Sequence, residues 1–261
     1  MAFSFGKMND SDATLFIQVS EITGSTQRGA IVDLVKDLKS NNLWSKMKAI
    51  YPFVGGTAAT HKWNLKDPRD VDAAFRLTFT GGWTHSSNGA DPNGTNAYAD
   101  TYLNASTILV SSNTHQSFYS GDDVDGLYFD IGATNFGSTQ IISIYSKYNG
   151  NSIGDVGNYT VSRVSGSVSN SQGLYVVSRT STTSLKLYKS NSTVNSNNTS
   201  DTASLPNSTI TLSAVLLSGT YQQYSPRQCR FASIGDGLTD TDAANLYTVV
   251  QKFQTTLGRQ V

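Results

Sequence analysis

The sequence predicts a mainly β protein: a two-sheet antiparallel jelly-roll sandwich with a short N-terminal helical cap and a C-terminal helix. Two observations carry this prediction. Apolar residues follow a helical period near both ends of the chain, whereas between about residues 71 and 235 many of them alternate with polar residues. The middle of the chain also consists of short strand-like runs separated by Gly, Asn and Asp turns, without interleaved helices. That pattern argues against a doubly wound α/β fold.

The first 23 residues are predicted to be an attachment segment. Ser11 is the expected N-cap of a helix over residues 12–22, although the run from Phe16 to Val19 also suits a strand. The apolar residues here are too few to form a core alone, so we expect them to dock on another chain. The alternative is that they fold back onto the core of the domain. The residues expected to serve assembly are Phe3, Phe5, Leu15, Phe16 and Val19.

Residues 24–56 are predicted to form the helical cap. An amphipathic helix over residues 25–39 ends at the pair Asn41-Asn42. Its apolar face recurs at positions i, i+3, i+4 and i+7, at Ile31, Leu34, Val35 and Leu38. A second short helix is expected from Leu43, Trp44 and Met47, and Pro52 ends the helical region.

Residues 57–261 are predicted to form the jelly-roll domain. The tract from Tyr188 to Ser208 has almost no apolar residues and is expected to be an exposed loop or hairpin tip. The expected strands are Ala73–Phe79, Ala97–Leu103, Gln116–Ser120, Gly126–Ile131, Ile141–Tyr148, Tyr159–Val164, Leu174–Arg179, Leu185–Tyr188, Ile210–Leu217 and Cys229–Ile234.

The last predicted element is a helix that Thr239 caps, with Asp242 three residues further on and Gly258 as its end. Its apolar stripe is expected to pack on the helix at residues 25–39 as a structural clasp, which places both chain ends on one side of the sandwich. The stripe consists of Leu246, Val249, Val250, Phe253 and Leu257.

Charge and apolar content exclude several classes of protein. The formal net charge is zero, from 19 basic and 19 acidic residues, and without a basic block we expect no nucleic-acid partner. No apolar run is long enough to cross a bilayer, and Met1 to Gly6 lacks the features of a secretory leader. We therefore expect a soluble protein made in a cytoplasm. Cys229 is the only cysteine, and we expect it to be buried and inert.

Both ends of the chain resemble a module found in structural proteins of tailed bacteriophages. The stretches Lys48 to Gly56, His61 to Asp70 and Gly82 to His85 are similar to its opening, and Cys229 to Val261 is similar to its close. The resemblance covers Thr23 to Val261. That module is a concanavalin A-like (laminin-G-like) jelly roll carried in tail fibres, head fibres or other virion appendages.

The resemblance implies a structural component of a virion, in a head or tail appendage such as a fibre or capsid decoration protein. The expected location is the virion after assembly in the host cytoplasm, and the expected partners are other virion proteins and further copies of this chain. The alternative is a carbohydrate-binding module that recognises a host cell-surface glycan. Fold alone does not decide between them.

A polysaccharide-degrading enzyme is the third hypothesis, and the carboxylates argue against it. Glycosidases place two carboxyl groups on either side of the scissile bond. Glu21 is the only glutamate, and no feature of the sequence selects two of the aspartates Asp100, Asp122, Asp123, Asp125 and Asp130. Residues 150–154 match the G-x-S-x-G pattern, but another strand follows, so we expect a flexible loop there and no catalysis.

No cofactor is expected, with calcium as the candidate ion if one binds. Asp122, Asp123 and Asp125 lie in one turn and offer oxygen ligands. The alternative is a solvated turn that Asp and Gly favour. His61 and His85 are too far apart in the sequence to indicate a metal centre, and the same holds for His115.

The candidate glycan-binding residues are Trp83, His85, Tyr98 and Asp100. Aromatic rings stack on sugar rings, and polar groups beside them bind hydroxyls. The alternative is that these aromatic residues close the core beneath loops. Tyr221 and Tyr224 lie in a polar turn and are expected to be exposed.

Overall fold

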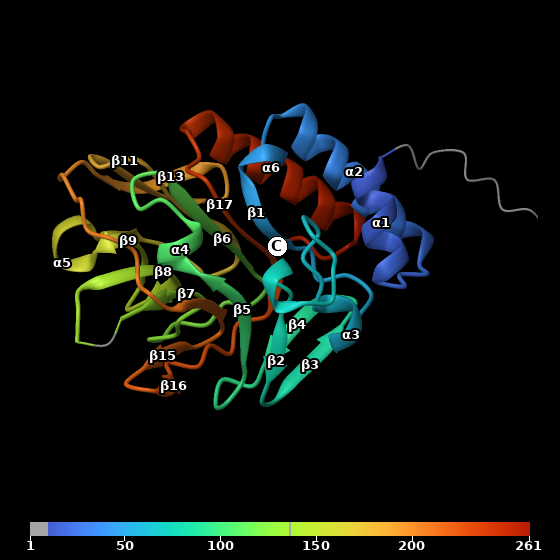
Figure 1. Ribbon diagram of the computed structural model, residues 1–261, viewed down its shortest axis with the longest axis horizontal. Helices are drawn as coiled ribbons and strands as arrows, with labels where there is room; N and C mark the ends of the chain where they lie inside the picture. Colours follow the sequence, from blue (N-terminus) through green and yellow to red (C-terminus); the bar gives the residue numbers. More distant parts are fainter. Residues whose placement is uncertain (1–9, 136) are drawn as a thin grey trace, which may run out of the picture.

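Two antiparallel β-sheets pack face to face, and helices cover the outer face of one of them (Figure 1). The computed structural model describes residues 10–135 and 137–261. This arrangement confirms the predicted sandwich with a helical region near its N-terminal end and a helix at its C-terminal end. No helix within those two ranges is long and apolar enough to span a membrane.

Sheet A is the sheet beneath the helices. Among the described residues it has eight strands, with β1 (Met47–Tyr51) paired to β17 beside the main path. The main path runs in the order β13 (Ser192–Asn197), β12 (Ser184–Lys189), β11 (Gly173–Ser181), β6 (Thr114–Ser120), β17 (Cys229–Gly235), β4 (Gly89–Pro92) and β3 (Trp83–Ser86).

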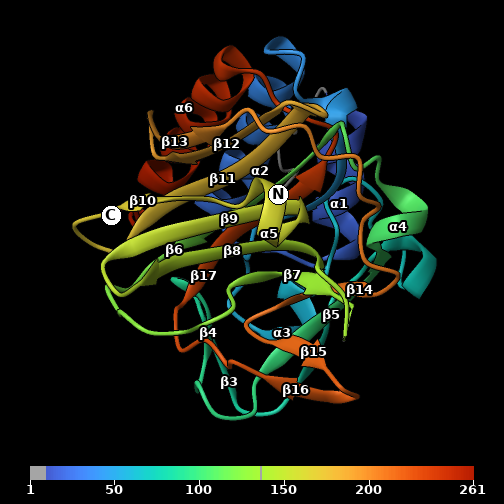
Figure 2. The same ribbon diagram turned by 90° about the vertical axis from the view of Figure 1, so that its left-hand side faces the viewer.

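Sheet B is the opposite layer. It has seven described strands, and a separate hairpin of β15 (Val215–Leu217) and β16 (Thr220–Gln222) lies beside it, as Figure 2 shows. The order in sheet B is β10 (Val164–Ser167), β9 (Asn151–Asn158), β8 (Gln140–Tyr148), β7 (Ile131–Thr134), β14 (Thr209–Leu212), β5 (Tyr98–Asn104) and β2 (Thr78–Thr80).

Side chains that alternate along the strands of sheet A supply two hydrophobic clusters. Phe118 faces the core between the sheets, whereas its neighbour Tyr119 faces the helices. The helical layer consists of α1 (Ser11–Val19), α2 (Ser25–Ser40) and α6 (Asp240–Thr256). Short helical turns elsewhere are η1 (Trp44–Lys46), α3 (Ala58–His61), η2 (Asp72–Ala74), α4 (Ala105–Ile108) and α5 (Tyr159–Ser162).

The predicted clasp between α2 and α6 is confirmed. The two apolar stripes share one buried cluster, and an ion pair between Lys252 and Asp37 (2.7 Å) joins the same two helices. Phe253 contacts Phe231 of β17 edge to face, with ring centroids 6.5 Å apart. Thr239 and Asp242 form the predicted capping box at the start of α6. The side chain that caps α1, however, is Asp10 and not Ser11.

Three predicted strands are wrong over all but their last one or two residues, because side chains hold the rest of the backbone in other conformations. Residues 73–77 form η2 and a left-handed turn at Phe75 (φ 58°), whose carbonyl accepts a hydrogen bond from the Tyr51 hydroxyl. Residues 126–130 are irregular because their carbonyls bind a buried arginine. Residues 159–162 form helix α5, since the Asn158 side chain accepts from the Thr160 N–H and caps it.

Other boundaries also differ from the prediction. The predicted second helix at residues 43–47 is the single turn η1, after which the chain enters β1 to pair with β17. The predicted strand 210–217 is broken at Ser213 (φ 66°) into β14 and β15. The expected loop at 188–208 contains β13, and the expected loop at 150–154 lies largely in β9.

Candidate functional site

A cleft of about 230 Å³ opens beside the outer face of sheet B, on the opposite side of the sandwich from α1, α2 and α6. Strand β8, helix α5, and the segments that flank the β15–β16 hairpin supply its walls. Alternation along β8 explains its position. Ile142 and Ile144 point into the core between the sheets, whereas Ile141 and Tyr145 point outward to the cleft.

The floor of the cleft is apolar. Phe129 and Tyr145 meet edge to face, with ring centroids 5.3 Å apart and planes at 82°. Val215 and Leu217 of β15 pack against these rings, and the Phe129 N–H donates to the Gln223 carbonyl (2.9 Å), so hydrophobic contact and backbone hydrogen bonding together hold the hairpin on sheet B. The floor is formed by Phe129, Ile141, Tyr145, Val215 and Leu217.

The rim of the cleft is polar. The Tyr145 hydroxyl donates to Gln223 Oε1 (3.1 Å), and Asn135 Nδ2 donates to the side chain of Gln140 (2.7 Å). Burial raises the pKa of the Tyr145 hydroxyl, so it stays protonated and remains a donor. The rim residues are Thr134, Asn135, Ser138, Tyr159, Arg163 and Gln223.

Arg163 is held in a fixed orientation at this rim. Its Nε and Nη2 donate to the two oxygens of Asp155, both at 2.9 Å, and its guanidinium lies over the ring of Tyr159 at 5.2 Å. Asp155 is buried, and burial raises the pKa of its carboxyl group. Ser143 also donates to Asp155, so the carboxylate is paired on both oxygens.

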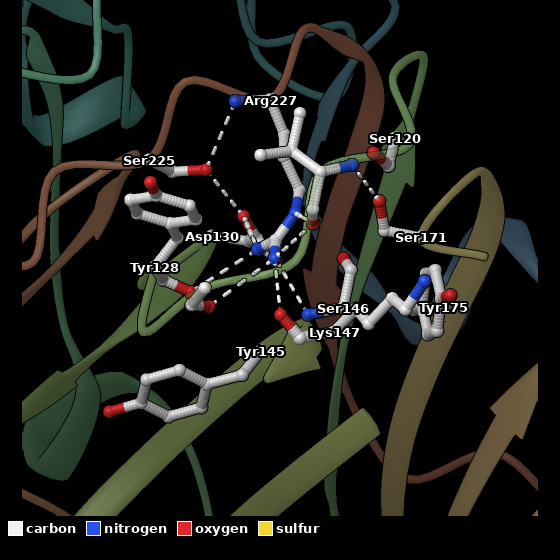
Figure 3. Close-up of polar contacts among 12 residues, drawn as sticks. Ser120, Tyr128, Asp130, Tyr145, Ser146, Lys147, Ser171, Tyr175, Ser225 and Arg227 are labelled. Carbon is white, nitrogen blue, oxygen red and sulfur yellow. Dashed lines mark hydrogen bonds and ion pairs between the residues drawn. The ribbon is translucent and has the colours of Figure 1, made fainter. Parts of the chain in front are cut away.

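A fully buried ion pair, between Arg227 and Asp130, lies next to residues of the cleft floor (Figure 3). Arg227 Nη1 lies 3.0 and 2.9 Å from the two oxygens of Asp130, and neither side chain is exposed to solvent. Asp130 also accepts from the Ser146 N–H and the Ser225 hydroxyl, both at 2.7 Å. Because Asp130 and Ser146 directly flank Phe129 and Tyr145 in the chain, this network fixes the two aromatic residues of the floor.

Two of the predicted glycan-binding residues, Trp83 and His85, lie with their rings stacked, 6.1 Å between the centroids, and glycan binding by the four predicted residues stays a prediction. Trp83 Nε1 donates to the backbone carbonyls of Thr80 (3.0 Å) and Tyr98 (3.2 Å). Its ring packs with Phe79 and His85, as expected for aromatic residues that close the core. The Tyr98 ring instead stacks on Tyr221, with centroids 3.6 Å apart, so Tyr221 is half-buried rather than exposed.

Asp100, the fourth predicted residue, accepts hydrogen bonds from its own strand and from the neighbouring strand β14. It accepts hydrogen bonds from the Tyr102 N–H (2.7 Å) and the Thr209 hydroxyl (3.3 Å). It therefore ties β5 to β14.

His61 and His85 come together although 24 residues separate them in the chain. Their Nδ1 atoms are 2.9 Å apart, and His61 Nε2 accepts a hydrogen bond from the Gly56 N–H (3.1 Å). Burial, with the nearby His85 and Arg259, lowers the pKa of His61 to about 3. His115 is buried elsewhere, and burial lowers its pKa to about 4.

The three aspartates considered for calcium each bind a different part of the chain. Asp122 accepts from the Gln228 N–H, Asp123 from the Ser171 N–H and Asp125 from the Gly150 N–H, at 2.8 to 2.9 Å. Within residues 10–135 and 137–261, no group of three or more His, Cys, Asp or Glu side chains is arranged to hold a metal ion. The carboxylates hold loops together, and calcium binding stays a prediction.

The predicted assembly residues differ in accessibility. Phe3 and Phe5 lie outside the described residues. Phe16 is fully buried in the cluster beneath α2 and α6, so its side chain folds back onto the domain, as the alternative interpretation held. Leu15 is 49% exposed and Val19 is half-buried, and their role in assembly stays a prediction.

Comparisons with known proteins support the fold. Neither protein-family models nor curated proteins give a match. Among solved structures, domain 4 of AbnA, a GH43 extracellular arabinanase from Geobacillus stearothermophilus determined in complex with arabinotriose, has a TM-score of 0.53 and 14% identity. That match covers 77% of this chain and 98% of the arabinanase domain.

Two further similar structures come from botulinum neurotoxins. The serotype D binding domain has a TM-score of 0.51 and 12% identity, over 78% of this chain and 52% of the toxin chain. A type C neurotoxin, described as depending on two ganglioside molecules for cell entry, has a TM-score of 0.53 and 11% identity, over 81% and 53%. This chain thus spans about half the length of the toxin chains, and at these identities the likeness concerns the fold alone.

Proposed function

We propose that this protein is a non-catalytic glycan-binding module and that the cleft on sheet B is its binding site. The observation that carries this proposal is the pairing of an apolar, aromatic floor with a fixed polar rim. Small-ligand sites combine apolar walls with a few oriented polar groups, and aromatic faces pack well on sugar rings. Tyr159 and Arg163 offer such a face and such a donor at the mouth of the cleft.

Two of the similar structures are consistent with this proposal. One was determined with a bound arabinotriose, and another belongs to a toxin whose cell entry depends on gangliosides. Both proteins are similar in fold to this chain, and both interact with sugars. Fold alone does not decide function, so the residues of the cleft carry the proposal.

The carboxylates favour binding over hydrolysis. Glycosidases need two carboxyl groups about 5–9.5 Å apart around the scissile bond. The described residues that line the cleft include neither Asp nor Glu. The nearby Asp155 and Asp130 are buried, and an arginine pairs with each of them. We therefore expect the module to hold a glycan and release it unchanged.

A glycan array followed by calorimetric titration tests the proposal. Tyr159→Ala removes an exposed ring at the rim and should weaken binding about tenfold, equivalent to about 1.4 kcal/mol. Val161→Ala is the matched control, since Val161 is on the same short helix, 38% exposed, and does not line the cleft. Equal affinities of the two variants, or release of reducing sugar from a bound glycan, would contradict the proposal.

We also propose that the module is carried on an appendage of a tailed-phage virion, where it contacts a host cell-surface glycan. This proposal rests on the resemblance of Lys48 to Gly56, His61 to Asp70 and Cys229 to Val261 to the phage module. Cryo-electron microscopy of particles labelled with an antibody against this chain tests it. Label on a head or tail appendage is the expected result, and particles without label would contradict it.

A further inference from the structure

We infer that the cleft selects a neutral sugar that carries an acylamino group, such as an N-acetylhexosamine unit of a glycan. This inference rests on the proposed glycan-binding function and names the class of sugar. The geometry that points to it is an apolar floor beside the amide side chains of Gln223 and Asn135. In each amide, one of the two polar atoms is hydrogen-bonded to the described part of the chain and the other is not.

The floor calls for an apolar substituent on the sugar. Ring hydroxyls pressed against the partly exposed Leu217 and the slightly exposed Ile141 and Tyr145 would lose water without gaining a hydrogen bond from the apolar side-chain atoms, which is unfavourable. A methyl group buried there gains hydrophobic contact instead. The cleft, at about 230 Å³, is below the usual range of about 300–1,000 Å³ for ligand pockets. It therefore suits one substituted sugar unit and not a long stretch of chain.

The rim supplies the partners of an amide. Gln223 uses Oε1 to accept from Tyr145, which turns its Nε2 donor the other way. Asn135 uses Nδ2 to donate to Gln140, which leaves its Oδ1 acceptor on the other side. In the part of the chain that the structure describes, Gln223 Nε2 and Asn135 Oδ1 have no hydrogen-bond partner. An acylamino group has one carbonyl for the first and one N–H for the second.

The charges favour a neutral sugar. The Arg163 guanidinium is already paired with both oxygens of Asp155, so the local charges cancel. The carboxylate of an acidic sugar would compete with Asp155 for the same guanidinium. The two negative charges would also repel each other across a weakly polar cleft. An amino sugar without the acyl group would bring a positive charge onto the apolar floor.

Titration of the wild-type protein with methyl glycosides of N-acetylglucosamine, glucose, glucosamine and glucuronic acid tests the inference. The N-acetyl sugar should bind at least about tenfold more tightly than the other three. In saturation-transfer NMR its acetyl methyl protons should receive the strongest signal. If glucose binds as tightly as its N-acetyl counterpart, the inference is wrong and the proposed function stands. If neither these probes nor an array of glycans binds, both are wrong.

An isosteric variant locates the contact. Gln223→Glu keeps the acceptor for Tyr145 but replaces the Nε2 donor by a second acceptor and adds a negative charge, so it should weaken binding of the N-acetyl sugar about tenfold. Gln222→Glu adds the same charge at the exposed neighbouring residue and should bind like wild type. Equal binding by both variants would overturn the assignment. Should Gln223→Glu not fold, the saturation-transfer pattern of the wild-type protein decides.

Discussion

Replacing Arg227 by Met removes the positive half of the buried ion pair next to the cleft floor. Asp130 would keep its bonds from Ser146 and Ser225 but lose its only ion-pair partner in the described structure. Arg227 also donates to the backbone carbonyls of Val124 (2.7 and 3.0 Å) and Lys147, which the thioether of Met cannot replace. The variant therefore leaves a buried charge without its ion-pair partner and removes a donor from four backbone carbonyls, those of Val124, Gly126, Tyr128 and Lys147.

The expected loss is large. Breaking a buried ion pair by removing one partner costs about 3–5 kcal/mol, and each deprived carbonyl adds about 1 kcal/mol or more. Domains of this size are stable by only about 5–15 kcal/mol. We therefore expect the variant to be marginally folded at 25 °C, with the loop at 122–128 and the floor of the cleft most affected.

Urea denaturation at pH 7 measures this effect as a lower midpoint. Arg69→Met is the matched control, because Arg69 pairs with Asp67 on the surface and is 67% exposed, so its midpoint should stay near that of wild type. The double variant Arg227→Met, Asp130→Leu should recover part of the loss, since it leaves no unpaired charge. Arg227→Met with the midpoint of the control would refute the reasoning.

Three further predictions follow from other parts of the structure. Phe253→Ala opens the clasp and should cost about 3–5 kcal/mol, whereas Thr248→Ala, exposed on the same helix, should leave the thermal melt unchanged; superimposed melts would rule the clasp out. The low pKa values of His61 (about 3) and His115 (about 4) mean that below pH 6.5 the unfolded chain binds protons that the folded chain does not. Stability should therefore fall by about 1.4 kcal/mol per pH unit per histidine between pH 6.5 and about 4, and equal denaturation midpoints at pH 7 and pH 5 would contradict this. Deleting residues 1–9, which keeps α1, should abolish incorporation into particles but leave sugar binding intact, and incorporation at the wild-type level would disprove the attachment role.

Local periodicity was sufficient to predict the three long helices α1, α2 and α6 and much of the sandwich, but not short helices such as α5. The apolar stripe of α6 fixed both its length and its partner, because a stripe of that width must be buried against another apolar face. Alternation failed where side-chain interactions overrode it. Residues 73–79 alternate well, yet ion pairs of Arg76 with Asp70 and Asp72 and the left-handed Phe75 give a turn, and the strand begins only at Thr78.

The cleft could not be predicted in the same way. Tyr145, Arg163 and Gln223 come from β8, from the residue after α5 and from the residue after β16. They meet because β8, β9 and β10 are neighbours in sheet B and the β15–β16 hairpin lies against its outer face. Such contacts depend on strand order and on hydrophobic docking of a hairpin, and neither leaves a motif in the sequence.

The two sheets differ in what they can present to a ligand. Residues such as Ile50 and Tyr119 on the outer face of sheet A are buried by α2 and α6, so a ligand there would have to displace the clasp. A ligand on the outer face of sheet B would not have to displace these helices, and outward side chains of β8 help to form the cleft there. In Figure 1, α1 and α5 lie at opposite ends of the long axis. Attachment through the segment before α1 would therefore turn the rim residues Tyr159 and Arg163 away from the particle, toward a host surface.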